Sequence, residues 1–144
     1  MSEDTQPQEG RIEENVKAYG LLINDDIMYL RFRPALYRED VPALDTLLEK
    51  ISTNAKRLKY YVFDLTELKK FDLRCCRPFA LAQNEARKQS SASVVTIQPE
   101  LPSIKKLMLD QGIIRPREIC ESRSRLYDFV KNIERTQKKK EENS

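Results

Sequence analysis

The most strand-like stretch of this sequence is Tyr60-Tyr61-Val62-Phe63-Asp64-Leu65. Its side chains are largely apolar at both odd and even positions, so neither face of the strand is suited to water. A strand of this kind is typical of the centre of a parallel sheet that is covered on both sides. Residues 93–97, Ser-Val-Val-Thr-Ile, repeat the pattern and predict a second buried strand, which Pro99 ends.

The sequence predicts one helix between these two strands and two more helices after them. Residues 78–88 predict a helix with its apolar residues on one face. Another helix is predicted from Ser103 to Gly112, where the glycine can end it in a left-handed conformation. A short strand near residues 118–120 and a last helix, whose apolar stripe ends at Ile133, complete this half of the chain.

The N-terminal half begins with two strands that suit an antiparallel hairpin. Residues 16–23 are mostly apolar, and residues 27–32 alternate between an apolar face and a face that ends in a charge. The intervening Asn-Asp-Asp at 24–26 is turn chemistry. Asp40 is suited to cap an amphipathic helix that fades around residue 52.

This order of elements predicts an α/β fold, with a mixed, mostly parallel five-stranded sheet and about four helices. We expect a single domain over residues 15–134, because 144 residues are too few for two ordinary domains. The acidic segment 1–14 and the charged segment 135–144 are predicted to be disordered tails.

The composition argues against catalysis. The chain has no histidine, which removes the commonest general base and the commonest zinc ligand. It has three cysteines, too few for a zinc site of four thiolates. Asp64 and Thr66 have only Glu67 as a nearby second acid, so we expect a structural turn there. We therefore predict no enzymatic activity, no metal and no cofactor.

Composition also bears on the compartment and on broad partner classes. An odd number of cysteines, two of them adjacent, fits a reducing compartment, and the N-terminal residues lack the apolar core of a secretory signal. No apolar run approaches the roughly 18 residues that a membrane helix needs. We predict a cytoplasmic protein without membrane insertion. A net charge of +3 gives no support to specific nucleic-acid binding.

Three stretches resemble the STAS domain, the module of anti-sigma factor antagonists and of the cytosolic tails of sulfate transporters. Residues 61–66 with 71–72 resemble the family's central strand and the approach to its regulatory loop. Residues 94–97 with Pro99 resemble its next strand and the exit from that strand. Residues 107–114 resemble its helix that ends in glycine plus an apolar residue. The resemblance runs from about Val16 to Ile133. It implies a STAS-like fold for the domain.

The chain departs from the family at the regulatory motif, Asp-Ser-Ser/Thr-Gly, in which a kinase phosphorylates a hydroxyl residue. The matching residues here are Asp72-Leu73-Arg74-Cys75. The acid is retained, but Leu73 and Arg74 replace both hydroxyl positions and Cys75 replaces the glycine. We therefore predict no phosphorylation at the family position.

The loop from Asp72 to Pro78 carries the remaining candidate residues. Partner binding is assigned to Asp72, Leu73, Arg74, Cys75 and Arg77, with the arginines supplying charge and the leucine an apolar anchor. Cys75 and Cys76 also lie between two arginines at a predicted helix start, where the helix dipole and nearby cations would lower a thiol pKa. The alternative interpretation of these two thiols is packing as small apolar side chains.

These observations favour a non-catalytic regulatory module that docks a protein partner. The resemblance implies an anti-sigma kinase-like protein, a stress-signalling scaffold or a transporter ATPase as that partner, and a homodimer is compatible with it. One alternative function is a thiol-based redox sensor that uses Cys75 and Cys76. Another is a polyanion binder that uses the lysine cluster Lys138, Lys139 and Lys140.

Overall fold

The computed structural model describes residues 18–54, 58–90 and 93–142 of the chain. Its main sheet has five strands: β1 (Tyr19–Asn24), β2 (Ile27–Phe32), β4 (Tyr60–Asp64), β6 (Ser93–Ile97) and β7 (Ile119–Cys120), in that spatial order. β1 is antiparallel to β2, and every other neighbouring pair is parallel. The predicted α/β class and the mixed, mostly parallel five-stranded sheet are confirmed.

The central strand β4 fixes the register of the sheet. Val62 lies opposite Tyr29 of β2 and Val95 of β6. All five residues of β4 are buried, as expected for a strand covered on both faces. The odd-numbered Tyr61 and Phe63 belong to the larger core, while Tyr60 and Val62 belong to a smaller core on the other face.

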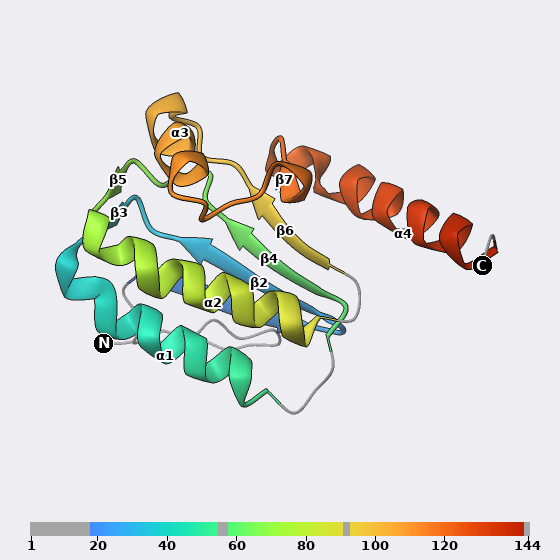
Figure 1. Ribbon diagram of the computed structural model, residues 1–144, viewed down its shortest axis with the longest axis horizontal. Helices are drawn as coiled ribbons and strands as arrows, with labels where there is room; N and C mark the ends of the chain where they lie inside the picture. The colour runs from blue at the N-terminus through green and yellow to red at the C-terminus, as the bar shows by residue number, and fades with distance from the viewer. Residues whose placement is uncertain (1–17, 55–57, 91–92, 143–144) are drawn as a thin grey trace, which may run out of the picture.

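Four α-helices accompany the sheet (Figure 1). α1 (Val41–Ser52) and α2 (Cys76–Gln89) lie side by side over the face that carries Phe63. α4 (Leu126–Glu142) packs its apolar stripe against the opposite face and then extends past the body of the molecule (Figure 1). α3 (Pro102–Asp110) ends at Gly112, whose φ of 70° confirms the predicted left-handed stop.

Two features of the fold differ from the sequence predictions. A second, two-stranded parallel sheet joins β3 (Ala35–Leu36) to β5 (Lys70–Phe71), and neither strand was predicted. α4 continues to Glu142, so the segment 135–142 is helical rather than a disordered tail. Its sequence is rich in Gln, Lys and Glu, which favour helices even without burial. The predicted acidic tail, residues 1–14, lies outside the described residues.

Short 3-10 helices connect several of these elements. They are η1 (Arg38–Asp40), η2 (Leu73–Cys75), η3 (Pro116–Glu118) and η4 (Arg123–Arg125). η2 runs directly into α2, so this helix begins at Cys76 instead of the predicted Pro78. Both β5 and η2 follow the carboxyl end of β4, where the candidate site lies.

Candidate docking site

Hydrogen bonds hold the loop that leads into α2, both to β3 and to η2. The backbone N–H of Asp72 donates to the carbonyl of Leu36 over 2.9 Å, which ties the loop to β3. The Asp72 side chain caps η2, because its Oδ1 accepts from the backbone N–H of Arg74 at 2.8 Å. Its Oδ2 lies 3.9 Å from the Arg74 guanidinium. Asp72 therefore shapes the loop, a role different from the partner contact to which it was assigned from the sequence.

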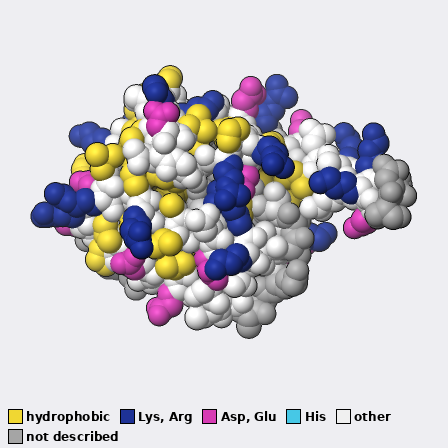
Figure 2. Space-filling view, viewed as in Figure 1, with side chains coloured by type: hydrophobic (Ala, Val, Ile, Leu, Met, Phe, Trp, Pro, Cys, Tyr) yellow, Lys and Arg dark blue, Asp and Glu magenta, His cyan; other side chains and the backbone are white. Residues whose placement is uncertain are grey.

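The outer surface of this loop combines an apolar side chain with cations. Leu73 is 64% exposed, the most of the leucines that the structure describes, and Arg74 and Arg77 are exposed beside it. Tyr37, which is 51% exposed, follows β3 and so lies next to the residues that follow β5. Figure 2 shows hydrophobic and cationic side chains interspersed at this end of the molecule, to the left in the view. We call Tyr37, Leu73, Arg74 and Arg77 the loop surface.

Tyr37 was not assigned to the site from sequence. The pairing of β3 with β5 brings it there, and two strands of two residues each carry no periodic signal that a sequence could reveal. Cys75, in contrast, was assigned to partner binding but is fully buried. Its side chain faces the core beneath the loop, so it presents nothing to a partner.

The two thiols have the opposite chemistry to the one predicted from their neighbours. Burial raises the pKa of Cys75 to about 12, with smaller contributions from the carboxylates of Asp72 and Asp40. The Cys75 thiol donates to the carbonyl of Tyr37 at 3.3 Å. Burial also raises the pKa of Cys76, and Asp72 adds to the effect. The expectation of low-pKa thiols is wrong, because the side chains turn into the protein instead of toward the arginines.

Alkylation of the native protein should therefore be slow. With iodoacetamide at pH 7, we expect Cys75 to remain unmodified while the unfolded chain reacts readily, because only the thiolate is a good nucleophile. The labelling rate of Cys76 should keep rising with pH beyond about pH 9, since its pKa is raised. Peptide mass spectrometry of timed samples measures both rates. Rapid labelling of either thiol at pH 7 would restore the redox-sensor alternative.

At the carboxyl end of β4 lies a buried carboxylate whose two oxygens are both hydrogen-bonded. Asp64 is the last residue of β4 and has 0% exposure. Its Oδ1 accepts from the backbone N–H of Thr66 at 3.0 Å and from the Thr66 hydroxyl. Its Oδ2 accepts from the hydroxyl of Tyr29 and from Nε of Arg123. The turn formed by Asp64 and Thr66 agrees with the structural role that the sequence predicted.

These hydrogen bonds decide the ionisation of the cluster. Burial by itself would raise the pKa of Asp64, but the hydrogen bonds from Thr66, Tyr29 and Arg123 outweigh it and hold the pKa below its usual range. The phenol of Tyr29, buried beside this carboxylate, has its pKa raised. Asp64 is therefore an anion with both oxygens occupied, which leaves it unsuited to act as a general base.

Arg123 also joins the cluster to Glu67, and this ion pair spans elements far apart in the sequence. Its Nη2 lies 2.9 Å from Oε2 of Glu67, an oxygen that Arg31 of β2 also contacts. The two guanidinium groups hold the pKa of Glu67 below its usual range. Arg123 thus fastens the start of α4 to the end of β4 and to the loop that leads toward β5. This role of Arg123 was not predicted from the sequence.

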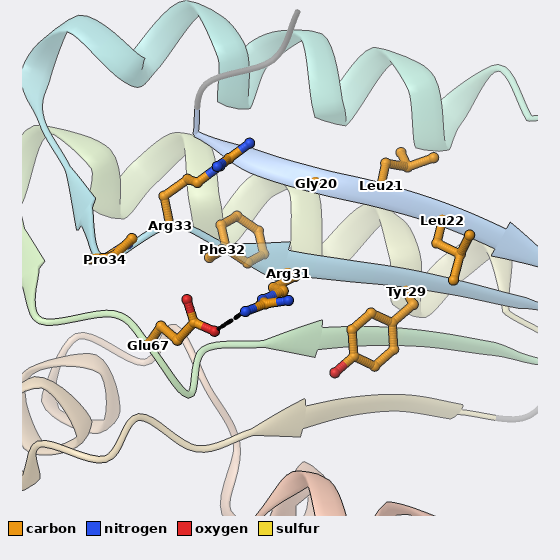
Figure 3. Close-up of a pocket in the computed structure, with 9 residues that line it drawn as sticks. All are labelled: Gly20, Leu21, Leu22, Tyr29, Arg31, Phe32, Arg33, Pro34 and Glu67. Atoms are coloured by element: carbon orange, nitrogen blue, oxygen red, sulfur yellow. Dashed lines mark hydrogen bonds and ion pairs between the residues drawn. The ribbon is translucent and has the colours of Figure 1, made fainter. Parts of the chain in front are cut away.

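A depression of about 430 Å³ opens beside this cluster, over β1 and β2 (Figure 3). Its charged end is formed by Arg31 and Glu67, which are paired with each other, and its apolar end by side chains such as Leu22 of β1. Figure 3 shows the Tyr29 side chain at its rim, directed toward β4 and so toward Asp64. A further cation, Arg33, also lines the depression and is exposed.

Neither a metal centre nor a membrane span is found in the described ranges. Among residues 18–54, 58–90 and 93–142, no group of three or more acids or cysteines is arranged to hold a metal ion. No helix in the same ranges combines the length and the apolar character required to cross a bilayer. Comparison of the chain with models of known protein families and with curated protein sequences finds no match.

Proposed function

We propose that this protein is a non-catalytic interaction module of the STAS type, which docks an anti-sigma kinase-like or other ATPase partner through the loop surface. The mixed five-stranded sheet and its four helices are compatible with that family resemblance. So is the place of the loop surface, directly after the central strand and at the start of α2, where the family carries its regulatory loop.

The observation that carries the proposal is the exposure of Leu73. Leu73 is 64% exposed, and the half-exposed ring of Tyr37 lies nearby. Covering these apolar side chains with the surface of a partner removes them from water and so favours binding. Asp72, Leu36 and the start of α2 hold the backbone of Leu73 in place, so little conformational entropy is lost when a partner binds. These are the properties of a binding hot spot.

The arginines around Leu73 indicate the charge of the proposed partner's surface. Arg38, Arg74 and Arg77 are exposed, and Glu39 and Asp72 lie 3.9 Å from Arg38 and Arg74. A third acid of this region, Asp40, accepts from the backbone N–H of Tyr37. Pairs this long and this exposed are weak, and among the described residues no carboxylate lies within ion-pair distance of Arg77. The partner should therefore present an apolar recess with acidic residues at its rim.

Regulation would differ from that of the phosphorylated relatives. A phosphate on the loop would add nearly two negative charges to a cationic contact and repel an acidic partner. Leu73 and Arg74 stand at the hydroxyl positions, and neither can accept a phosphate ester. We propose that docking is constitutive on the side of this chain, with control exerted through the partner.

Affinity capture from the source cytosol tests this function. The immobilised wild-type chain is expected to retain a protein with an ATPase fold, and Arg74→Glu should lose it, because the variant places an acid against an acidic rim. Arg135→Glu makes the same charge change on α4, far from the loop surface, and should retain the partner. Equal capture by Arg74→Glu and the wild type, or capture of no ATPase-fold protein, would contradict the proposal.

A further inference from the structure

A second surface, separate from the loop surface, lies on the α4 side of the sheet. An open groove of about 800 Å³ runs between α4 and the turn formed by η3. Phe129 and Ile133 of α4 line its floor together with Pro116, and Arg115, Arg117 and Lys140 surround it. In Figure 1, α4 continues beyond the end of the sheet, so only the first part of this helix is covered by strands.

The residues of α4 that line the groove form one continuous face of that helix. Phe129, Ile133, Thr136 and Lys140 follow one another at spacings of three and four residues, so they share one side of the helix. At 1.5 Å per residue this face is about 16 Å long, the length of three helical turns. Phe129 and Ile133 are only partly buried even though they pack against the smaller core. The groove is therefore long enough for a short peptide, with an apolar part of about 6 Å at Phe129 and Ile133 and polar side chains along the rest.

The side chains that line the groove carry a net positive charge. Its one carboxylate, Glu118, is bound to Arg87 of α2 at 2.7 Å. Among the described residues, no carboxylate lies within ion-pair distance of Arg115, Arg117 or Lys140. Three cations without such a partner, placed around an apolar floor, favour a ligand that is both acidic and apolar.

We propose that this groove binds an acidic amphipathic peptide segment of a protein partner, with an apolar residue of the segment on Phe129 and Ile133 and its carboxylates near Arg115, Arg117 and Lys140. A single strand of nucleic acid fits less well, because such ligands need exposed aromatic faces for base stacking. Among the described residues that line the groove, Phe129 is the one aromatic side chain, and it is part of the core packing.

This site does not depend on the proposed function. The groove belongs to the α4 face of the sheet, whereas the loop surface belongs to the start of α2, which covers the opposite face. A partner at one surface leaves the other accessible. The chain would then hold two protein segments at once, and the groove supplies the second of them.

Fluorescence anisotropy with a labelled synthetic peptide of alternating Glu and Leu residues tests the groove at about 0.15 M salt, where distant charges are screened. We expect Arg115→Glu/Arg117→Glu to weaken binding about tenfold or more. The matched control, Arg135→Glu/Lys138→Glu, reverses two charges on the opposite side of α4 and should change binding less than about twofold. All four side chains lie outside the core, so both variants should fold.

Three results would overturn the inference. The first is a wild-type chain that does not bind the peptide. The second is an equal loss in both double variants, which would show that general attraction by the positive charge of α4 accounts for binding. The third is tighter binding of a labelled oligothymidylate than of the peptide by the wild-type chain, which would assign the surface to nucleic acid instead.

Discussion

Phe79→Ala is expected to lower the free energy of unfolding by about 4 kcal/mol, a loss near the upper end of what truncating one core side chain causes. Phe79 projects from α2 into the larger core and is almost completely buried. Its ring centroid lies 5.1 Å from that of Phe32, 5.9 Å from Phe63 and 5.8 Å from Phe71. Alanine would remove this shared contact between α2 and three strands and leave a cavity that rigid neighbours cannot fill.

Urea denaturation followed by circular dichroism measures this loss. The matched control is Leu81→Ala, a substitution two residues along the same helix at an exposed position, for which we expect a change within about 0.5 kcal/mol. A loss from Phe79→Ala as small as that of the control would mean that α2 does not pack on the sheet as described.

Arg123→Met is expected to lower the free energy of unfolding by about 2 to 3 kcal/mol at pH 7, because breaking a buried pair on one side is costly. The substitution keeps an apolar stem but leaves the buried carboxylate of Asp64 without its cation. The loss stays at the lower end for such pairs because Arg123 is itself 40% exposed and Asp64 keeps its bonds to Tyr29 and Thr66. Arg125→Met removes only an exposed contact with Glu121 at 3.8 Å and should cost less than about 1 kcal/mol.

The pH dependence of the same variant gives an independent readout. In the wild type the folded-state pKa of Asp64 lies below its unfolded value, so the stability from this group is present above the unfolded pKa and is lost as pH falls through the folded pKa. Without Arg123, burial should raise the pKa of Asp64. The difference in unfolding free energy between wild type and variant should therefore shrink on acidification, as measured by denaturation between about pH 7 and pH 3. A difference independent of pH would contradict the role given to Asp64.

The main elements of the fold could be predicted because they carry strong patterns. The buried run at residues 60–65 and the amphipathic stripe of α1 leave few alternatives for where a strand or a helix lies. β3 and β5 could not be predicted, because two residues show no period and their pairing depends on the tertiary structure. The helical end of α4 was not predicted because its polar sequence lacks an apolar stripe that faces the core. It forms a helix because its residues have high helix propensity.

The candidate site was predictable where a local rule governs it. Asp72 caps η2 and Arg74 and Arg77 are exposed, as a helix start in a polar loop requires. Of the two interpretations of the thiols, packing as small apolar side chains agrees with the buried Cys75, and a lowered thiol pKa does not, because arginines adjacent in sequence say nothing about which way a cysteine points. Arg123 was missed because it is 59 residues from Asp64 in the chain. A carboxylate at the end of a wholly apolar strand was nevertheless a signal that a cation must lie nearby.

The proposed docking role of the loop surface is tested most directly by the dissociation constant between the purified chain and its proposed ATPase-fold partner. We predict that Leu73→Ser weakens this binding about thirtyfold, the effect of losing a hot-spot side chain worth about 2 kcal/mol. The control is Tyr127→Ser, which changes an apolar side chain that is 71% exposed on α4 and leaves the loop surface intact. Unchanged affinity for Leu73→Ser, or an equal loss for Tyr127→Ser, would contradict the account.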